Sequence, residues 1–297
     1  TNNSANEGGA LYIHWGGNVT NCNFVDNYAV SGLGGAANLN MVNVTNCNFT
    51  NNRSPDDGGA FSMQYGRVEN CSFSRNRGYR GGALFLSGRG TVMNCNFTNN
   101  FGTTMATAWV YSGTVKNCNF TNNKGGRNGG GVWMRDGTVE NSKFTNNSAI
   151  EGGAVCFDDN GRVTNCNFIN NSAEGGGAVK MAKGEVTNSN FRHNTAAFGS
   201  AIRFSEIDAD DRISNCVFLD NRADMVGDTP FKVVKNINHT EIILEVRNNY
   251  INAISSSSVI KFSNVTYWGV GGIVNTDSSA PIISRSEERF SRNAETD

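Results

Sequence analysis

The chain has little of several features that common protein classes need. Its 297 residues carry 25 lysines and arginines against 26 aspartates and glutamates, which gives a formal net charge of −1. Without a basic excess there is no electrostatic reason to expect nucleic acid or an anionic membrane as a partner. No stretch approaches the roughly 18 consecutive apolar residues of a membrane span, and no signal peptide is present. These absences argue against a nucleic-acid-binding protein and against a direct membrane span in this fragment.

The N-terminus begins within a pattern that recurs further along the chain. Thr1-Asn2-Asn3 matches Thr50-Asn51-Asn52 and Thr98-Asn99-Asn100, and each of the later copies follows a phenylalanine. We therefore interpret the chain as a fragment of a longer secreted protein. On that interpretation the missing signal peptide and anchor say nothing about location.

Proline and helical periodicity are also scarce. Only 3 prolines occur beside 35 glycines, and asparagine is frequent and clustered. No segment has apolar residues at the i, i+3, i+4 spacing of an amphipathic helix, which excludes the helical repeat arrays. The regular Gly-Gly-x-Gly-x-Asp nonapeptide of calcium-binding β-rolls is absent as well.

A repeat of about 24 residues runs through most of the chain. Its most regular block is Val-x-Asn-(Cys/Ser)-x-Phe-x-x-Asn, whose phenylalanine recurs at Phe24, Phe49, Phe73, Phe97, Phe120, Phe144, Phe168, Phe191 and Phe218. A second block, Gly-Gly-Ala-apolar-x-apolar, lies between these copies, as in residues 81–86. Both blocks alternate with period 2, which is the periodicity of β-strands.

The repeat predicts an all-β fold, a right-handed parallel β-helix with coils of about 24 residues. A copy this short cannot bury its own apolar side, so successive copies must stack. Stacking aligns equivalent residues in columns, and the right hand follows from the chirality of parallel crossovers. We expect these columns to be inward: the Val, the Cys/Ser and the Phe of the first block, and the second and fourth residues after Gly-Gly. The asparagine columns suit turns, because asparagine tolerates left-handed backbone and stacked amides hydrogen-bond along the axis.

The repeat also divides the chain. Residues 1–225 are predicted to form the β-helix coils, and residues 226–275 are predicted to form irregular terminal coils that cap the apolar end. Residues 276–297 have the polar, serine-rich composition of a linker-like tail.

The motifs resemble known surface proteins. Gly-Gly-Ala paired with Phe-x-x-Asn resembles the polymorphic outer-membrane protein repeat of chlamydial adhesins and autotransporters. The Asn-Cys-x-Phe-Thr-Asn-Asn coils, with residues 262–269 and 272–277 after them, are more similar to adhesin-like surface proteins of methanogenic archaea. The two resemblances together cover about residues 1–280. They imply a β-helix at a cell surface, hence an extracellular location and an adhesive role, and they supply no catalytic residue to carry over.

We therefore expect a monomeric, non-catalytic stalk that binds a cell-surface glycan or protein and carries no cofactor and no metal. The candidate binding residues are Phe85, Trp109 and Trp133, with Tyr111 beside them. The three aromatic residues occupy the third position after Gly-Gly in successive coils, a column predicted to face outward. Exposed aromatic faces suit sugar rings or a protein partner. The alternative is that a loop from a neighbouring turn covers them.

Seven of the eight cysteines fall in one column, two residues before the phenylalanine, and Ser142 and Ser189 fill its other two places. Strands about 4.8 Å apart keep neighbouring Cβ atoms beyond the usual disulfide range. A linear column also lacks the tetrahedral arrangement of a zinc site. We expect buried, reduced thiols that pack as small apolar residues.

The rival function is a β-helical carbohydrate-active enzyme, such as a polysaccharide lyase. Its candidate carboxylates are Asp56-Asp57, Asp158-Asp159 and the run Asp208, Asp210, Asp211. A lyase needs carboxylates for calcium and a base on one face. These acids sit at different phases of the repeat, so solvated turns are their expected place. His14, His193 and His239 also occupy unrelated repeat positions, which gives no histidine-based triad or metal site.

Overall fold

Each repeat bends at the asparagine that precedes the phenylalanine. In all nine copies, from Asn21 to Asn215, this residue has a φ between 50° and 54°. Asparagine adopts this left-handed backbone more readily than most residues, because its short side chain bonds locally. The Val-x-Asn-Cys-x-Phe block is therefore two strands around a corner rather than one.

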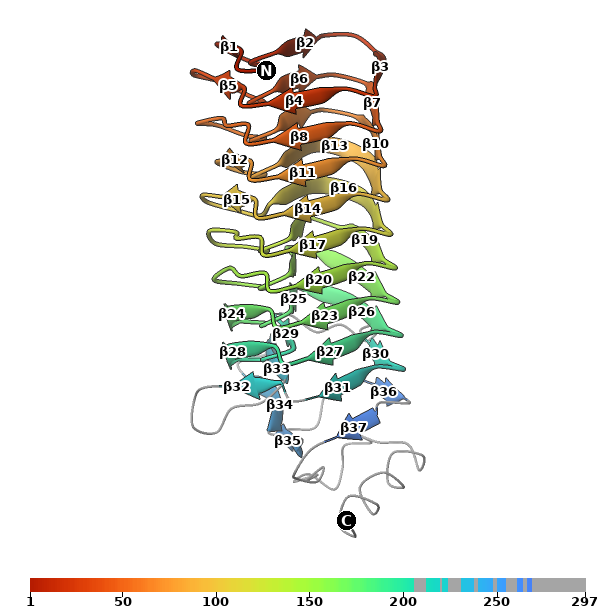
Figure 1. Cartoon of the computed structure of the whole chain (residues 1–297). Helices are drawn as coiled ribbons and strands as arrows, with labels where there is room; N and C mark the ends of the chain where they lie inside the picture. Colours follow the sequence, from red (N-terminus) through yellow and green to blue (C-terminus); the bar gives the residue numbers. More distant parts are fainter. Residues whose placement is uncertain are drawn as a thin grey trace.

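The computed structural model shows the result, a parallel β-solenoid of stacked coils without helices among its described residues (Figure 1). It describes residues 1–205, 212–219 and 221–223 and five further strands between residues 231 and 268. The predicted parallel β-helix is confirmed.

Three strand columns build the coils. The phenylalanine column is a ten-stranded sheet of β4 (Asn23–Val25), β8 (Asn48–Thr50), β11 (Ser72–Ser74), β14 (Asn96–Thr98), β17 (Asn119–Thr121), β20 (Lys143–Thr145), β23 (Asn167–Ile169), β27 (Asn190–Arg192), β31 (Val217–Leu219) and β37 (Thr266–Trp268). The valine column holds β3 (Gly17–Thr20), β7 (Val42–Thr45), β10 (Gly66–Glu69), β19 (Gly137–Glu140), β22 (Asn160–Thr164), β26 (Lys183–Thr187), β30 (Arg212–Ser214) and β36 (Lys261–Ser263).

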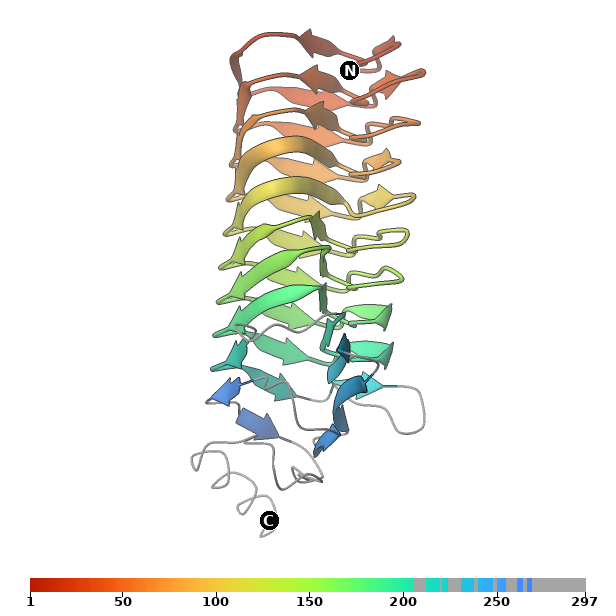
Figure 2. The same ribbon diagram turned by 180° about the vertical axis from the view of Figure 1, so that it is seen from behind.

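The Gly-Gly column forms the opposite wall of the rod, seen from behind in Figure 2. It holds β2 (Leu11–Ile13), β6 (Ala37–Leu39), β9 (Phe61–Met63), β18 (Val132–Met134), β21 (Val155–Phe157), β25 (Val179–Met181), β29 (Ile202–Phe204) and β33 (Phe231–Ile237). Two longer strands, β13 (Leu84–Met93) and β16 (Ala108–Lys116), run through both the Gly-Gly and the valine columns.

Loops project along one side of the rod, between the phenylalanine strand and the next Gly-Gly block (Figure 1). Short parallel strands link some of them: β1 (Ser4–Ala5), β5 (Tyr28–Ala29), β12 (Arg77–Gly78), β15 (Phe101–Gly102), β24 (Ser172–Gly175), β28 (Thr195–Phe198) and β32 (Arg222–Ala223). This loop wall is the feature that the repeat pattern did not predict.

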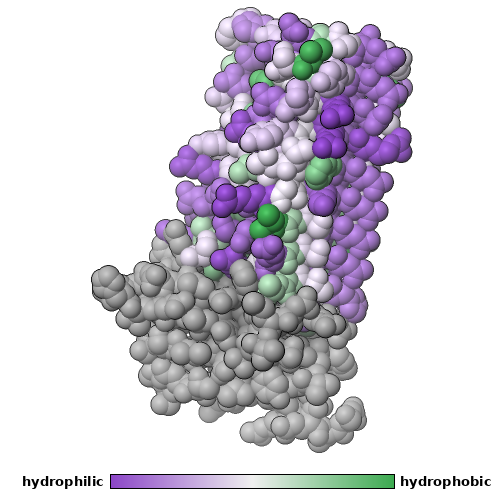
Figure 3. Space-filling view, turned by 90° about the vertical axis from the view of Figure 1, so that its left-hand side faces the viewer, coloured by the Kyte–Doolittle hydropathy of each residue, from purple (hydrophilic) through white to green (hydrophobic). Residues whose placement is uncertain are grey.

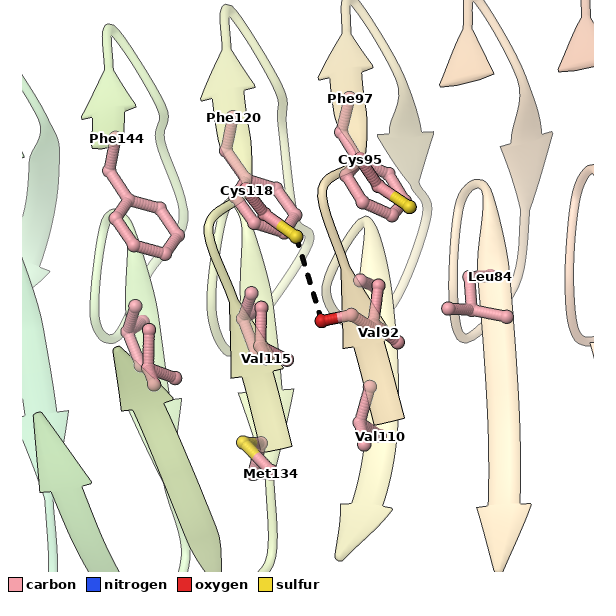
Figure 4. Close-up of a cluster of buried hydrophobic side chains, with 14 of the residues drawn as sticks. Leu84, Val92, Cys95, Phe97, Val110, Val115, Cys118, Phe120, Met134 and Phe144 are labelled. Atoms are coloured by element: carbon pink, nitrogen blue, oxygen red, sulfur yellow. Dashed lines mark hydrogen bonds between the residues drawn. The ribbon is translucent and has the colours of Figure 1, made fainter. Parts of the chain in front are cut away.

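The core is a continuous set of side-chain columns. Phenylalanine rings stack from Phe24 to Phe218 with centroids 4.5–5.1 Å apart and planes within 12° of parallel. Figure 4 shows three of these rings in adjacent coils, beside the valine and cysteine columns. The predicted inward positions are confirmed, including the fourth residue after Gly-Gly, which is buried from Leu39 to Phe204.

A second column, the asparagine three residues after the phenylalanine, is buried as well from Asn27 to Asn194. Asn147 represents it. Its Oδ1 accepts from the backbone N–H and the Nδ2 of Asn123, both at 3.0 Å. Its Nδ2 donates to the carbonyl of Phe120 and to Oδ1 of Asn171, again at 3.0 Å. Every hydrogen-bonding position of the amide is used, so burial carries no unsatisfied group. This confirms the predicted asparagine ladder.

The C-terminal strands return to the repeat after an interruption. β33 pairs with β34 (Thr240–Arg247), and β34 with β35 (Tyr250–Ile254), both antiparallel. β36 and β37 then rejoin the parallel stack, with Phe262 opposite Ile213 and Tyr267 opposite Phe218. Residues 262–267 are therefore a tenth copy of the motif. The capping role of residues 226–275 stays a prediction, and residues 276–297 lie outside the described residues.

The described residues contain strands and no helix, and hence no helical candidate for a membrane span.

The stacked phenylalanine column predicts which coils lose stability when a core residue is replaced. Phe120 is fully buried between the rings of Phe97 and Phe144. Phe120→Ala should cost about 3–5 kcal/mol of unfolding free energy, because a cavity replaces the ring. Coils interact only with their neighbours, so hydrogen exchange should accelerate near residues 97–144 and little elsewhere. Uniform loss of protection in every coil would contradict this.

Candidate functional site

The predicted aromatic column exists as a stack. Phe85, Trp109 and Trp133 lie opposite one another on β13, β16 and β18. The ring centroids are 4.4 Å apart between Phe85 and Trp109 and 4.5 Å apart between the two indoles, with planes 20° and 11° from parallel. Tyr111 lies beside Trp109, with centroids 5.9 Å apart. We call Phe85, Trp109 and Trp133 the covered aromatic stack.

This stack points away from the main core, as predicted, but the expectation that it is exposed is wrong. Phe85, Trp109 and Trp133 are 6%, 7% and 5% exposed. They form a second, smaller hydrophobic cluster with Ala106 and Cys156, and Met105 and Tyr111 pack against it. The loop wall explains the burial, because Met105 and Ala106 lie just beyond the projecting strand β15.

The guanidinium of Arg80 covers part of the covered aromatic stack. The guanidinium carbon of Arg80 lies 4.9 Å from the ring centroid of Phe85 and 5.6 Å from that of Trp109. Arg80 is held in turn by Asp57: Nε lies 2.9 Å from Oδ1 and Nη2 lies 2.5 Å from Oδ2. A guanidinium over an aromatic face is attractive, more so where water is displaced. The stack and this ion pair together fasten the loops to the Gly-Gly wall.

The expectation that the acidic pairs lie in solvated turns is wrong for Asp57, which is 2% exposed. Burial raises the pKa of Asp57, and the hydrogen bonds from Arg80 lower it in opposition. Removing Arg80 would leave a buried, unpaired charge, which is far more costly than losing an exposed pair. Asp57 is thus tied to a structural contact.

The indole N–H groups of the stack are left without an acceptor. Among the described residues, neither Nε1 of Trp109 nor Nε1 of Trp133 finds a hydrogen-bond partner, although both atoms are buried. The hydroxyl of Tyr111, at the edge of the stack, accepts a hydrogen bond from Arg135. Whether Phe85, Trp109, Tyr111 and Trp133 bind a ligand stays a prediction, and the exposure on which it depended is absent.

The other acidic and histidine candidates that the structure describes do not converge. Asp158 and Asp159 are exposed, and Asp158 lies 3.6 Å from Nζ of Lys180. His14 and His193 are exposed and lie at opposite ends of the described coils. Asp208, Asp210, Asp211 and His239 lie outside the described residues. Within the described part of the chain, no three His, Cys, Asp or Glu side chains group as metal ligands.

The cysteine column is buried as predicted. All eight cysteines are free, and only Cys22 is partly exposed. The thiols donate inward to backbone carbonyls, as Cys118 does to Val92 at 3.6 Å (Figure 4). Burial raises the pKa of Cys166 to about 12, since the thiolate would lose its hydration. Such thiols are poor nucleophiles at neutral pH.

Exposed apolar side chains gather elsewhere, on the first three coils. Tyr12 is 56% exposed and Trp15 is 72% exposed, at the turn from β2 to β3. Met41 and Tyr65 occupy the equivalent turn in the next two coils and are 53% and 42% exposed. With His14, these residues form what we call the exposed aromatic patch: Tyr12, His14, Trp15, Met41 and Tyr65.

The patch has ordered rings. His14 stacks on Tyr12 with centroids 6.3 Å apart and planes 8° from parallel, and meets Trp15 edge-on at 5.1 Å. Tyr65 lies against Gly88 of the fourth coil, where a Cβ would come within 2.4 Å of its ring. The glycine therefore lets the tyrosine ring lie close to the rod.

This patch was not predicted from the sequence. The predicted outward column lies inside the strand, whereas Trp15, Met41 and Tyr65 follow the end of the strand by two residues. An apolar residue at that corner in three successive repeats is the signal that could have revealed it.

The loop side of the rod offers less apolar surface. In Figure 3 hydrophobic residues appear there as separate spots among hydrophilic ones, and a hydrophilic band follows the rod along one edge. The exposed apolar residues on this side include Tyr28, Val30, Tyr79 and Ile150.

Comparison with known proteins supports the fold. The family model described as "Right handed beta helix region" matches residues 8–156. No curated protein and no solved structure matches significantly. The match covers the covered aromatic stack and the exposed aromatic patch, and it agrees with the predicted right hand of the coils.

The buried thiols predict an alkaline loss of stability. Cys166 has a folded pKa of about 12, against about 8.5 for a thiol in an unfolded chain. The contribution of the buried Cys166 thiol to the free energy of unfolding is complete below about pH 8.5. It falls by about 1.4 kcal/mol per pH unit as the pH rises toward the folded pKa, because the thiol ionises only in the unfolded chain. In urea unfolding between pH 8 and pH 11, Cys166→Ser should therefore lose stability less steeply than the parent, by about 1.4 kcal/mol per pH unit.

Serine suits the position because Ser189, the next residue of the column, bonds its own coil in the same way. Cys22→Ser is the control, since Cys22 is partly exposed. Equal slopes for the Cys166→Ser variant and the parent would refute the role of thiol burial.

Proposed function

We propose that this chain, which belongs to the right-handed β-helix family, is part of a cell-surface adhesin: a rigid, non-catalytic stalk that also carries a binding surface. The observation that carries the proposal is the exposed aromatic patch. Large apolar side chains stand open to water in three successive coils of a rod whose phenylalanine, valine and cysteine columns are buried. Exposed apolar surface of this kind marks an interaction site more often than an accident of packing.

The packing of the core supports the proposal of a rigid stalk. From the first coil to the ninth, a phenylalanine ring stacks on the ring of the next coil, and an asparagine amide bonds the amide of the next coil, as Phe120 and Asn147 do. A solenoid joined in this way resists bending at any single coil, because each coil is packed against two neighbours. It would hold a binding face at a fixed distance from its point of attachment.

The surface charges support a non-catalytic role. Several carboxylates pair with a base of the same or the preceding coil: Glu69 with Arg67, Glu140 with Lys116 and Glu185 with Arg162, each at 2.8 Å. A lyase or hydrolase site gathers carboxylates and a base around one substrate position. Here the pairs are spread over separate coils. The rival proposal remains a β-helical carbohydrate-active enzyme.

The proposed location is extracellular, and the proposed partner is a glycan or protein of a neighbouring cell. The resemblance of the repeats to chlamydial outer-membrane repeats and to archaeal adhesin-like proteins supports this. The balanced charge supports a partner other than nucleic acid. We propose a monomer without cofactor.

One experiment separates the two functions. The chain should be incubated with neutral and uronic-acid polysaccharides, and each mixture assayed both for binding and for new reducing ends or unsaturated products. An adhesin binds at least one polysaccharide or whole-cell surface and leaves chain length unchanged. Reproducible cleavage that is lost after heat denaturation of the chain would establish the enzyme instead.

A further inference from the structure

We propose that the exposed aromatic patch binds an uncharged glycan, with sugar rings lying on Tyr12, Trp15 and Tyr65. This inference rests on the proposed function, and it names the ligand class and the place of binding. It takes the binding surface away from the covered aromatic stack and puts it on the first three coils, at the turn between β2 and β3.

Met41 and Tyr65 lie in coils that have a neighbour on each side, and they are still 53% and 42% exposed. In the first coil, His14 stacks on Tyr12 and meets Trp15 edge-on. A sugar ring has an apolar face of C–H groups and a rim of hydroxyls. That face fits the negative face of an aromatic ring, and the contact covers apolar area without burying a charge.

Polar side chains follow the turns of the patch. On β7 and β3, Asn43 donates to Asn18 at 3.3 Å in an exposed amide pair. A sugar hydroxyl can donate to, or accept from, exposed amides of this kind.

The patch is also free of charged side chains of its own. The patch columns hold no Asp, Glu, Lys or Arg in the first three coils, at residues 12, 14, 15, 38, 40, 41, 62, 64 and 65. The same columns in later coils carry charges, at Arg135, Asp136, Asp158, Asp159 and Lys180. Glu7 lies beside the patch and accepts a hydrogen bond from Asn38 at 2.9 Å. These nine positions offer an acidic sugar no counter-charge, and Glu7 would repel it, so the expected ligand is neutral.

The spacing of the patch residues along the rod also fits a glycan. Trp15, Met41 and Tyr65 recur once per coil, at a rise of about 4.8 Å. Three such side chains span about 10 Å along the rod. This matches a short run of linked sugar rings better than a protein, which needs about 800 Å² on each partner for a stable contact. The glycan would lie parallel to the rod axis.

The test uses the full chain and affinity electrophoresis in gels that contain mannan, a neutral β-glucan or polygalacturonate. The parent chain should be retarded by at least one neutral polysaccharide and not by polygalacturonate. The double variant Trp15→Ala, Tyr65→Ala should bind that polysaccharide at least about tenfold more weakly, since exposed aromatic anchors carry much of such binding energy. Trp15→Tyr keeps a ring and should retain most of the affinity.

Tyr79→Ala is the matched control, because Tyr79 is 46% exposed but lies on the loop side. Circular dichroism and thermal unfolding should show that all variants keep the fold. Unchanged affinity in the double variant, or retardation by polygalacturonate alone, overturns the inference. If the chain binds whole cells but none of the neutral glycans, the inference fails while the adhesin proposal stands. Cleavage of any polysaccharide would instead reject the proposed function.

Discussion

The rod depends on one interaction, the buried asparagine amide that joins each coil to the next. A coil of about 24 residues has too little apolar surface to fold alone, so its stability comes from its neighbours. The amide accepts two hydrogen bonds from the coil before it, and it donates to the phenylalanine carbonyl of that coil and to the amide of the coil after it. A shift of one residue would break all four bonds at once. The ladder therefore fixes the register in which the phenylalanine rings can stack.

The sequence predicted the features that depend on this register, namely the inward columns and the turns. Period-2 alternation placed the phenylalanine, valine and cysteine columns inside, and the asparagines before each phenylalanine at the turns, where they have φ near 50°. Alternation tells on which side of a strand a residue lies, but not what lies above it. Trp109 and Trp133 were therefore predicted to be exposed, whereas the loop wall covers them. Asp57 was predicted to lie in a solvated turn for the same reason. Its partner Arg80 comes from the next coil, which the alternation within one strand does not describe.

Two further features were not predicted from the sequence, because they lie where the regular repeat is interrupted or between its strands. The motif at residues 262–267 was not recognised as a tenth copy, since the antiparallel strands β34 and β35 separate it from the ninth. The exposed aromatic patch lies at corners rather than in strands, where the period-2 pattern gives no guidance. The binding surface proposed here thus lies in the part of the coil that the repeat constrains least.

The central claim is that the asparagine ladder holds the coils in register, and one substitution tests it directly. Asn147→Asp keeps the shape of the side chain but replaces two donors by a carboxylate oxygen that faces the carbonyl of Phe120 and Oδ1 of Asn171. Asn146→Asp, one residue away, makes the same change of charge at an exposed left-handed turn, where Asp26 occurs naturally. Urea unfolding at pH 7 should show a loss of at least about 3 kcal/mol for Asn147→Asp and little change for Asn146→Asp. Equal stability of the two variants would contradict the account.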